Sequence, residues 1–499
     1  MTAVDLQTRP ESPARWFNPL ALRQSWLSMD KNDRVVEWAQ SKLGIAVLHG
    51  AFLLALATLP VIRAKHMALI AMTLVLAALL PGRRGMVLAG MGILFFLLRP
   101  FRSEFHYTNF GEIWPEIGVL GAMNAQAGLM ACSLVFFGLV LLLIENHRRK
   151  AVSVLAERPI LSLLIAGTAL TALTVLVPRD HGLFTVAWIL VAYLSSSFFF
   201  IGYILMAVRQ KGRMDNTTLL GYVRPFWANT VVPIKGPGYL AKFEAKDAAA
   251  LAVTRLKGLK LAVWAVILFW TGEIVFNQVV HSTLGLPHFE AHLKAVAVGG
   301  PASVALGWAV VAIYFLERVL VFGAVIHALV AVVRMAGFAI PRGMVKPLGS
   351  RTISEYWGKY LFYFKELLSD FFFFPTFQRC FKKHPRLRIA FATFMAAFVG
   401  NILFDVICDA PVFAIDGFAA TIDNFYSYTV YAGGLTVGII WSQLFQGKVR
   451  PEDGFLRYQV LPRVIVLGFF ALLQIFDDSS GVIPLGDRFA FFASLFGVN

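Results

Sequence analysis

Residues 183–208 read LFTVAWILVAYLSSSFFFIGYILMAV, a stretch that contains no charged side chain. A helix crosses a bilayer when about 20 consecutive residues are mainly apolar, so this stretch predicts a transmembrane helix. Comparable apolar stretches lie on both sides of it, at 43–62, 66–81, 86–98, 117–144, 160–177, 259–280, 302–333, 387–408, 427–445 and 460–476. The sequence therefore predicts an all-α polytopic membrane protein with about eleven transmembrane helices, together with re-entrant or interfacial helices.

The composition of the chain excludes an ordinary soluble protein. Of its 499 residues, 58% are hydrophobic and 15% are charged, whereas soluble domains carry about 25% charged residues. So small a charged fraction does not keep the surface of a soluble protein hydrated. We expect residues 43–499 to form a single transmembrane domain. Residues 1–42 precede it, either as a cytoplasmic tail or as a helix in the membrane interface.

The net charge of +16 comes largely from clusters of Lys and Arg between the apolar stretches. No basic segment is interleaved with base-stacking aromatic residues, so membrane lipid, and not nucleic acid, is the expected partner. The clusters at 31–42, 83–84, 148–150 and 209–213 fall on one side of the membrane when the stretches are counted as spans. By the positive-inside rule that side is expected to be cytoplasmic, and the N-terminus is expected on the same side.

The distribution of polar residues divides the transmembrane domain. Residues 43–208 contain few of them and are expected to be scaffold spans, 220–410 carry polar side chains inside apolar stretches, and 411–499 form C-terminal spans. Polar groups in a membrane are costly, so function is expected in the second half. The stretch 302–333 contains Glu317 and Arg318, and is either one long tilted helix or two broken ones.

Two segments differ from ordinary spans and loops. Residues 231–243 read VVPIKGPGYLAKF, and two prolines and two glycines within six residues forbid a regular helix. This segment is expected to be re-entrant or to lie on the membrane surface. Residues 353–370 are aromatic on most faces of a helix but also charged. Ser354 is expected to cap that helix with Glu355 in its first turn, and the helix is expected in the interface or beside a polar cavity.

Three side chains inside apolar stretches are candidate catalytic residues: His327, Asn401 and Asp405. Asn401 and Asp405 are four residues apart, so they share one face of a helix, and that face is expected to meet a cavity. An ionisable group at the depth of His327 indicates function by default. The alternative for His327 is a neutral imidazole hydrogen-bonded to a neighbouring helix.

No metal centre is expected. His281, His288 and His292 share one loop with Glu290, but their spacing matches no tight ligand motif. The three cysteines are widely spaced and form no CxxC motif. The chain also lacks the Gly-x-Ser-x-Gly elbow that a Ser-His-Asp hydrolase of the α/β type requires.

The order of these segments resembles the membrane-bound O-acyltransferase superfamily, in particular the bacterial branch of alginate O-acetylases and teichoic-acid D-alanyl transferases. Pro233–Phe243 is similar to the branch's GPI-x-R-Y-x-x-F segment, and Arg334–Pro341 to its R-M-x-G-F-x-x-P segment. Ile353–Tyr360 matches the branch's S-I-x-x-F-W-R-R-W-H segment in order and spacing. Asp370–Pro375 matches its aromatic segment that ends in Y-x-Y-x-P. The resemblance covers residues 220–410.

The resemblance implies a tunnel through the helical body and a cytoplasmic acyl-CoA or acyl-carrier thioester as donor, with no bound cofactor. The acceptor would be a hydroxyl on a polymer, a lipid or an exported carrier of the cell envelope, and a partner acyltransferase is a candidate protein partner. The location implied is the bacterial inner (cytoplasmic) membrane. The residues expected to bind substrate are Lys235, Tyr239, Trp357, Lys359 and Asp370; for Lys359 the alternative is a lipid headgroup.

Both histidines of the family are missing from the matching positions. The family's Trp-His pair falls at Tyr360–Leu361, and its second histidine falls near Gly400–Leu403, where no His occurs. Acyl transfer to a hydroxyl needs a base, and leucine cannot act as one. The chain is therefore an acyltransferase with a different base, or an inactive relative that binds lipid or an acyl chain or supports an export complex. A transporter is a third possibility, although no inverted repeat supports it.

Overall fold

The computed structural model describes residues 19–98, 125–149, 158–209, 214–300, 303–447, 450–478 and 480–498. Within these ranges the regular secondary structure is helical and no strand occurs, which confirms the predicted all-α class. Residues 1–18 of the expected tail, 117–124 of the fourth expected span and 210–213 of one basic cluster lie outside the described residues.

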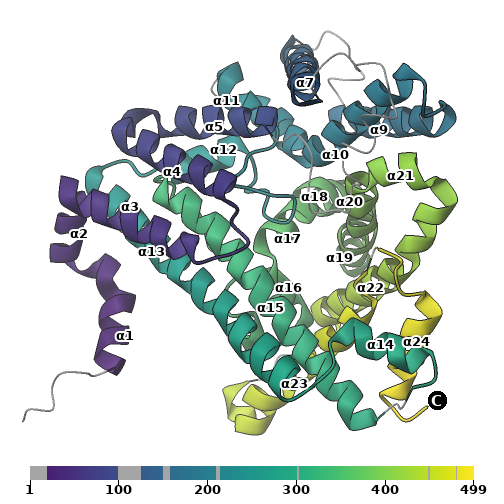
Figure 1. Ribbon diagram of the computed structural model, residues 1–499. Helices are drawn as coiled ribbons and strands as arrows, with labels where there is room; N and C mark the ends of the chain where they lie inside the picture. The colour runs from purple at the N-terminus through teal and green to yellow at the C-terminus, as the bar shows by residue number, and fades with distance from the viewer. Residues whose placement is uncertain are drawn as a thin grey trace, which may run out of the picture.

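The helices follow one another along the chain without a β layer between them (Figure 1). The first part forms α1 (Pro19–Ser28), α2 (Asp33–Gln40), α3 (Lys42–Ala57), α4 (Ala64–Leu79), α5 (Arg84–Leu98), α7 (Ala125–Arg149), α9 (Pro159–Leu176) and α10 (Gly182–Val208). The middle part forms α11 (Asn216–Leu220), α12 (Pro237–Leu240), α13 (Ala248–Thr271) with its π-helical extension η4 (Gly272–Thr283), α14 (Phe289–Ala297) and α15 (Val304–Met335).

The remaining helices surround the segments that sequence analysis singles out. They are α16 (Ile353–Tyr360), α17 (Phe362–Leu368), the π-helical η6 (Ser369–Phe373), α18 (Phe374–Arg379), α19 (Pro385–Phe394), the π-helical η7 (Met395–Gly400) and α20 (Asn401–Cys408). The chain ends with α21 (Ala410–Asp416), α22 (Phe418–Leu444), the π-helical η9 (Leu456–Val460), α23 (Leu461–Leu473), the 3₁₀ turn η10 (Gln474–Phe476) and α24 (Leu485–Ser494).

In the described part of the chain, eight helical stretches are long and apolar enough to cross a membrane: 81–98, 130–149, 159–176, 183–208, 248–283, 304–335, 385–408 and 456–476. A ninth results if α2 and α3, bent by 94° at their junction, count as one span. The sequence predicts about eleven. The difference arises because α4 has only 16 residues and α22, although 27 residues long, carries too many polar side chains to match the other spans.

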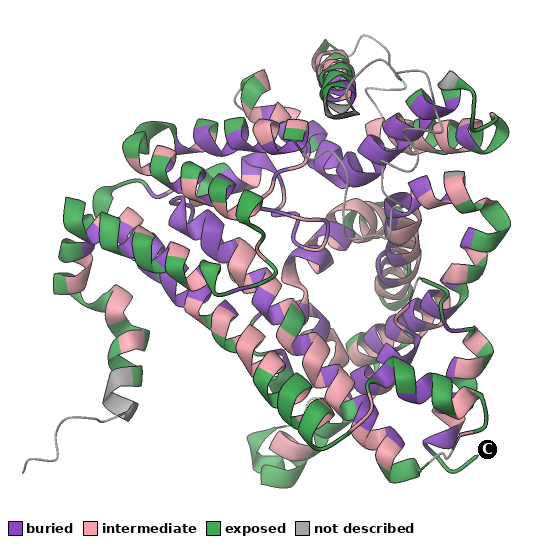
Figure 2. Ribbon diagram, in the orientation of Figure 1, coloured by how far each residue is buried: buried purple, intermediate pink, exposed green. Residues whose placement is uncertain are grey.

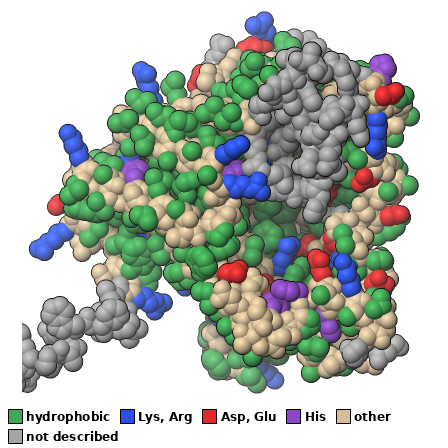
Figure 3. Space-filling model, in the orientation of Figure 1, with side chains coloured by type: hydrophobic (Ala, Val, Ile, Leu, Met, Phe, Trp, Pro, Cys, Tyr) green, Lys and Arg blue, Asp and Glu red, His purple; other side chains and the backbone are tan. Residues whose placement is uncertain are grey.

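Burial and exposure within the helical body support its placement in a membrane. In the most apolar 18 residues of the span 183–208, 89% are buried, so α10 is largely enclosed by other parts of the chain, whereas only 6% of the residues of 159–176 are buried (Figure 2). Large apolar side chains are exposed on many helices, Leu176 among them with 80% of its surface open, and hydrophobic side chains cover much of the face drawn in Figure 3. Patches of this extent are not tolerated in water and fit lipid as the surrounding solvent.

The long helices α13 and α15 run side by side through the molecule (Figure 1). Gly258 of α13 permits this close approach, because a Cβ there would lie 3.1 Å from the backbone nitrogen of Met335. The chain forms one continuous helix from Val304 to Met335 and not two broken ones. Arg318 and His327 lie about two and a half turns apart on this helix, so they have different neighbours.

Segment 231–243 is irregular as predicted, whereas 353–370, predicted as one helix, is interrupted at Leu361 between α16 and α17 and ends in the π-helical η6. In 231–243 the backbone is left-handed at Ile234 (φ 47°), Lys235 (φ 40°) and Gly236 (φ 76°) before the single turn of α12. A Cβ on Gly236 would lie 2.7 Å from the Cβ of Tyr203, so this approach requires glycine. The predicted Ser354 cap is wrong: Thr352 caps α16, its Oγ1 accepting from the Glu355 N–H at 3.0 Å. The helix starts earlier because Glu355 also accepts from the Arg351 N–H at 2.7 Å.

Candidate functional site

A cavity of about 350 Å³ lies among α15, α16, α20, α22 and the junction of α23 with η10. Each helix contributes polar or aromatic side chains spaced three or four residues apart, so one face of each helix lines the cavity. Those that decide its chemistry are Arg318, Tyr356, Trp357, Tyr360, Asn401, Asp405, Tyr428, Tyr431, Gln474 and Asp477. The cavity is therefore polar in the middle of an apolar helical body.

Four buried polar atoms that border this cavity have no hydrogen-bond partner in the structure: Arg318 Nε, Tyr356 Oη, Tyr360 Oη and Gln474 Oε1. Tyr356 is 1% exposed and Gln474 is 7% exposed. Leaving a buried donor or acceptor unsatisfied costs about 1–3 kcal/mol. Several such groups around one cavity indicate that water or a polar ligand satisfies them.

Three of the charged side chains that line the cavity, Arg318, Asp477 and Asp478, form ion pairs. Arg318 Nη2 lies 3.1 Å from Asp477 Oδ2, and the guanidinium stands 4.9 Å from the centre of the Phe322 ring. Asp478 forms an ion pair with Arg488 of α24. Each pair balances its own charges, and Arg318 Nε keeps hydrogen-bonding capacity toward the cavity.

Three of the residues expected at a functional site line the cavity together: Trp357, Asn401 and Asp405. Asn401 is fully buried, and its Nδ2 donates to the carbonyl oxygen of Ala397 at 2.6 Å. The hydroxyl of Tyr428 donates to Asn401 Oδ1 at 3.5 Å. Asn401 and Asp405 share the cavity-facing side of α20, as their spacing predicts.

His327 and Lys359 are not among the residues that line this cavity. His327 is half-buried on α15, and its Nδ1 lies 2.6 Å from the carbonyl oxygen of Gly323 in the same helix. Lys359 forms an ion pair at 2.5 Å with Glu355, one turn earlier in α16. The structure therefore separates these two candidates from Asn401 and Asp405.

Lys235, Tyr239 and Asp370 meet in a second cluster. Lys235 Nζ lies 2.7 Å from Glu366 Oε2 and 3.1 Å from Asp370 Oδ2, and 5.8 Å from the centre of the Tyr239 ring. The hydroxyl of Tyr203, on α10, donates to Asp370 Oδ2 at 3.2 Å. The 231–243 segment is thereby tied to α17, η6 and α10.

Burial and charge act in opposite directions on the two carboxyl groups of this cluster. Burial raises the pKa of Asp370, and the nearby Lys235 only partly offsets it. Burial also opposes ionisation of Glu366, but hydrogen bonds from Lys235 and Lys365 outweigh it and lower the pKa of Glu366. Lys235 in turn loses hydration by burial, yet its two carboxylate partners raise its pKa. Lys235 and Lys365 balance Glu366 and Asp370, so the four charges sum to zero.

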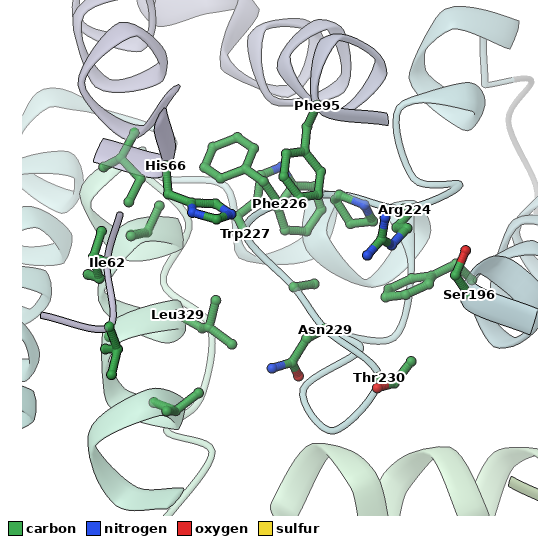
Figure 4. A pocket seen from close by; sticks show the side chains of 18 residues that line it. Ile62, His66, Phe95, Ser196, Arg224, Phe226, Trp227, Asn229, Thr230 and Leu329 are labelled. Atoms are coloured by element: carbon green, nitrogen blue, oxygen red, sulfur yellow. The ribbon is translucent and has the colours of Figure 1, made fainter. Parts of the chain in front are cut away.

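Another cavity, of about 290 Å³, lies beside the loop 224–230 (Figure 4). His66 and Phe95 from α4 and α5 border it, with their ring centres 5.9 Å apart, and the guanidinium of Arg224 stands 5.7 Å from the Phe95 ring. Among the side chains that line this cavity, Thr230 has a buried hydroxyl oxygen without a hydrogen-bond partner. None of these residues is predicted from the sequence to be a site residue. The larger polar cavity carries more unsatisfied groups and is the stronger candidate.

Sequence reasoning missed much of the polar cavity. Tyr356 and Tyr360 lie in a segment that it singled out, but Tyr428, Tyr431, Gln474 and Asp477 belong to the C-terminal spans, outside 220–410. The available signal was polar side chains three residues apart inside apolar stretches, at 428 and 431 and again at 474 and 477. Comparison with protein-family models and with curated protein sequences finds no match to this chain.

Proposed function

We propose that the chain is a membrane-embedded O-acyltransferase-like protein whose polar cavity holds the reacting groups. One observation carries the proposal. The two positions at which the membrane-bound O-acyltransferases that the sequence resembles would place their histidines are Tyr360–Leu361 and Gly400–Leu403, more than 35 residues apart in sequence. Tyr360, Leu361 and Asn401 all border one cavity. Segments that resemble the halves of an acyl-transfer site thus meet where buried polar groups lack partners.

In this proposal Asp405 replaces the missing histidine as the base. Its carboxylate takes the proton of the acceptor hydroxyl, the oxygen attacks the thioester carbonyl, and the thiolate leaves with that proton. The products are an ester and a free thiol. Arg318 Nε and the hydroxyls of Tyr356 and Tyr360 are unsatisfied groups that border the same cavity, and they would stabilise the developing oxyanion. Asn401 and Trp357 hold the substrates, and His327 has no part in the step.

The donor proposed is acyl-CoA or an acyl-carrier thioester from the cytoplasm, and the acceptor a hydroxyl on a polymer, lipid or exported carrier. The Lys235 cluster has no excess positive charge for a donor phosphate, so we assign it to holding the 231–243 segment in place. The location proposed is the bacterial cytoplasmic membrane with the N-terminus inside, from the basic clusters. A reporter active only in the cytoplasm, fused to the N-terminus, tests this: activity is expected, and an inactive reporter would reverse the orientation.

A second candidate is a relative that binds an acyl chain or lipid without catalysis. Two observations favour it. No histidine among the described residues lines the polar cavity. On the other side of α20, Leu403, Val406 and Ile407 border an apolar groove of about 400 Å³ that α9, α10 and α21 complete. Such a groove accommodates a hydrocarbon chain with its polar end toward α20.

A single reconstitution experiment separates these functions. Purified protein in liposomes is incubated with acyl-CoA labelled in the acyl group, and free thiol, labelled ester and retained label are measured. The proposed enzyme releases thiol and forms labelled ester in equal amounts. Label retained without thiol release supports the binding protein. Movement of intact label into the liposome lumen, with neither product, supports a transporter and contradicts the proposal.

A further inference from the structure

Three side chains from separate elements meet where the end of η4 lies beside α15. They are His281 at the end of η4, His288 just before α14, and Glu317 of α15. Their ligand atoms all lie within 4.8 Å of one another. In Figure 3, histidine, acidic and basic side chains gather on the part of the surface where α14 lies. The side chain of His281 is 5% exposed and that of Glu317 21% exposed, so two of the three are shielded from solvent.

The hydrogen-bond partners of His281 are both acceptors. Its Nδ1 lies 2.7 Å from the carbonyl oxygen of Leu286, and its Nε2 lies 3.0 Å from Glu317 Oε1. A neutral imidazole has one N–H. If Nδ1–H donates to the carbonyl, the lone pair of Nε2 faces a carboxylate oxygen, and a cation between the two removes that repulsion. A histidine anchored through its other nitrogen to a backbone carbonyl is the usual arrangement of a metal ligand.

His288 brings a second imidazole to the cluster. Its ring stacks on that of His281, with centres 3.8 Å apart and planes at 26°. One divalent cation bound to both imidazoles and to the carboxylate would take one ligand atom from each of the three residues and compensate the negative charge of Glu317.

We propose that His281, His288 and Glu317 bind a divalent transition-metal ion, with Zn²⁺ as the best match. Two imidazoles and one carboxylate suit Zn²⁺ and leave one tetrahedral position for water or another ligand. The ion would link η4, the connection before α14, and α15. Glu317 adjoins Arg318, which reaches the polar cavity, so the ion would also fix that part of α15.

The sequence expectation of no metal considered only residues close together in the chain. Of the four loop side chains considered, His292 is buried and packs edge-on against Phe491 with ring centres 5.8 Å apart, while Glu290 is exposed. The third ligand comes instead from α15, 29 residues beyond His288. A spacing of this length matches no local motif, and only the packing of α15 beside η4 brings the carboxylate into place.

The test uses the full-length protein without a histidine tag, purified in detergent, stripped with a chelator and titrated with ZnCl₂ in a calorimeter. About one equivalent is expected to bind. His281→Ala and Glu317→Gln are each expected to weaken binding at least about tenfold. Glu290→Gln removes a charge from the first turn of α14, outside the cluster, and serves as the matched control with unchanged affinity. Co²⁺ in place of Zn²⁺ should give the visible absorption of a four-coordinate site, absent in His281→Ala.

His288→Ala guards against loss of the fold, because this side chain is exposed and its removal leaves the core intact. It is expected to elute from gel filtration as the unaltered protein does, and to bind Zn²⁺ at least about tenfold more weakly. Binding of well under one equivalent by the unaltered protein would overturn the proposal. So would equal affinity in the unaltered protein and all three ligand variants.

Discussion

At the scale of single residues, the chemistry of the polar cavity depends on Asn401 and Asp405 of α20 and on the ion pair between Arg318 and Asp477. The spacing of Asn401 and Asp405 correctly placed both on one face of a helix that borders a cavity. The pairing of Arg318 with Asp477 joins residues 159 positions apart, and no local pattern indicates it. His327 shows the converse. Its position inside an apolar stretch gave it prominence, but a carbonyl of its own helix engages its Nδ1.

The Lys235 cluster predicts opposite pH responses for two neighbouring carboxyl groups. The pKa of Glu366 lies below its usual value of 4.5 in the folded protein, so its contribution to stability is present above pH 4.5 and is lost as the pH falls through the lowered pKa. The pKa of Asp370 lies above its usual value of 3.8, so folding gains stability as the pH falls through that raised pKa toward 3.8.

Thermal unfolding in detergent from about pH 6 to about pH 3.5 measures both effects. Glu366→Gln is expected to lose less stability on acidification than the unaltered protein, because the group that loses stability is gone. Asp370→Asn is expected to lose more, because the compensating gain is gone. Identical slopes in the three proteins would show that these carboxyl groups are not held as described.

At the scale of elements, sequence predicted where the helices lie better than where they begin. Glu355 falls in the first turn of α16 as expected, but the helix begins one residue before Ser354 and Thr352 caps it. Thr352 and Ser354 are both suitable N-cap residues. The hydrogen bond from the Arg351 backbone N–H to the Glu355 carboxylate selects Thr352. This choice depends on a side-chain contact, which the N-cap preferences of single residues do not include.

The corrected cap leads to a stability prediction for α16. Thr352→Ala removes the acceptor for the Glu355 N–H and is expected to lower the free energy of unfolding by about 1 kcal/mol. Ser354→Ala is the matched control, with a change within about 0.5 kcal/mol, because its side chain makes no cap bond. Thermal unfolding of the two purified variants measures the difference. A larger loss from Ser354→Ala than from Thr352→Ala would restore the original assignment.

The crossing of α5 and α11 depends on a glycine. A Cβ on Gly92 would lie 2.1 Å from the carbonyl oxygen of Gly221, whereas nothing lies within 4 Å of a Cβ on Gly90 of the same helix. Gly92→Ala is therefore expected to destabilise the protein by about 1–3 kcal/mol through overpacking, and Gly90→Ala to leave it unchanged or slightly more stable. The melting temperatures of both variants in one detergent give the comparison. Equal values would mean that the two helices do not approach so closely.

At the scale of the whole molecule, composition and hydropathy were sufficient for the fold class but not for the site. Apolar stretches gave an all-α membrane body, and eight or nine spans in the described residues replace the expected eleven. The polar cavity joins residues 231 to 480, including spans assigned to the C-terminal part. Contacts at such separations arise from the packing of complete helices, which the sequence of each helix does not specify.

The central claim is that acyl transfer takes place in the polar cavity with Asp405 as the base. Its most direct test is the initial rate of ester formation from labelled acyl-CoA by purified protein in liposomes. Asp405→Asn is expected to lower this rate at least about a hundredfold. Asp423→Asn, the same change at an exposed position of α22 away from the cavity, is expected to retain it. An unchanged rate in Asp405→Asn, or no ester formed by the unaltered protein with any common thioester, would contradict the claim.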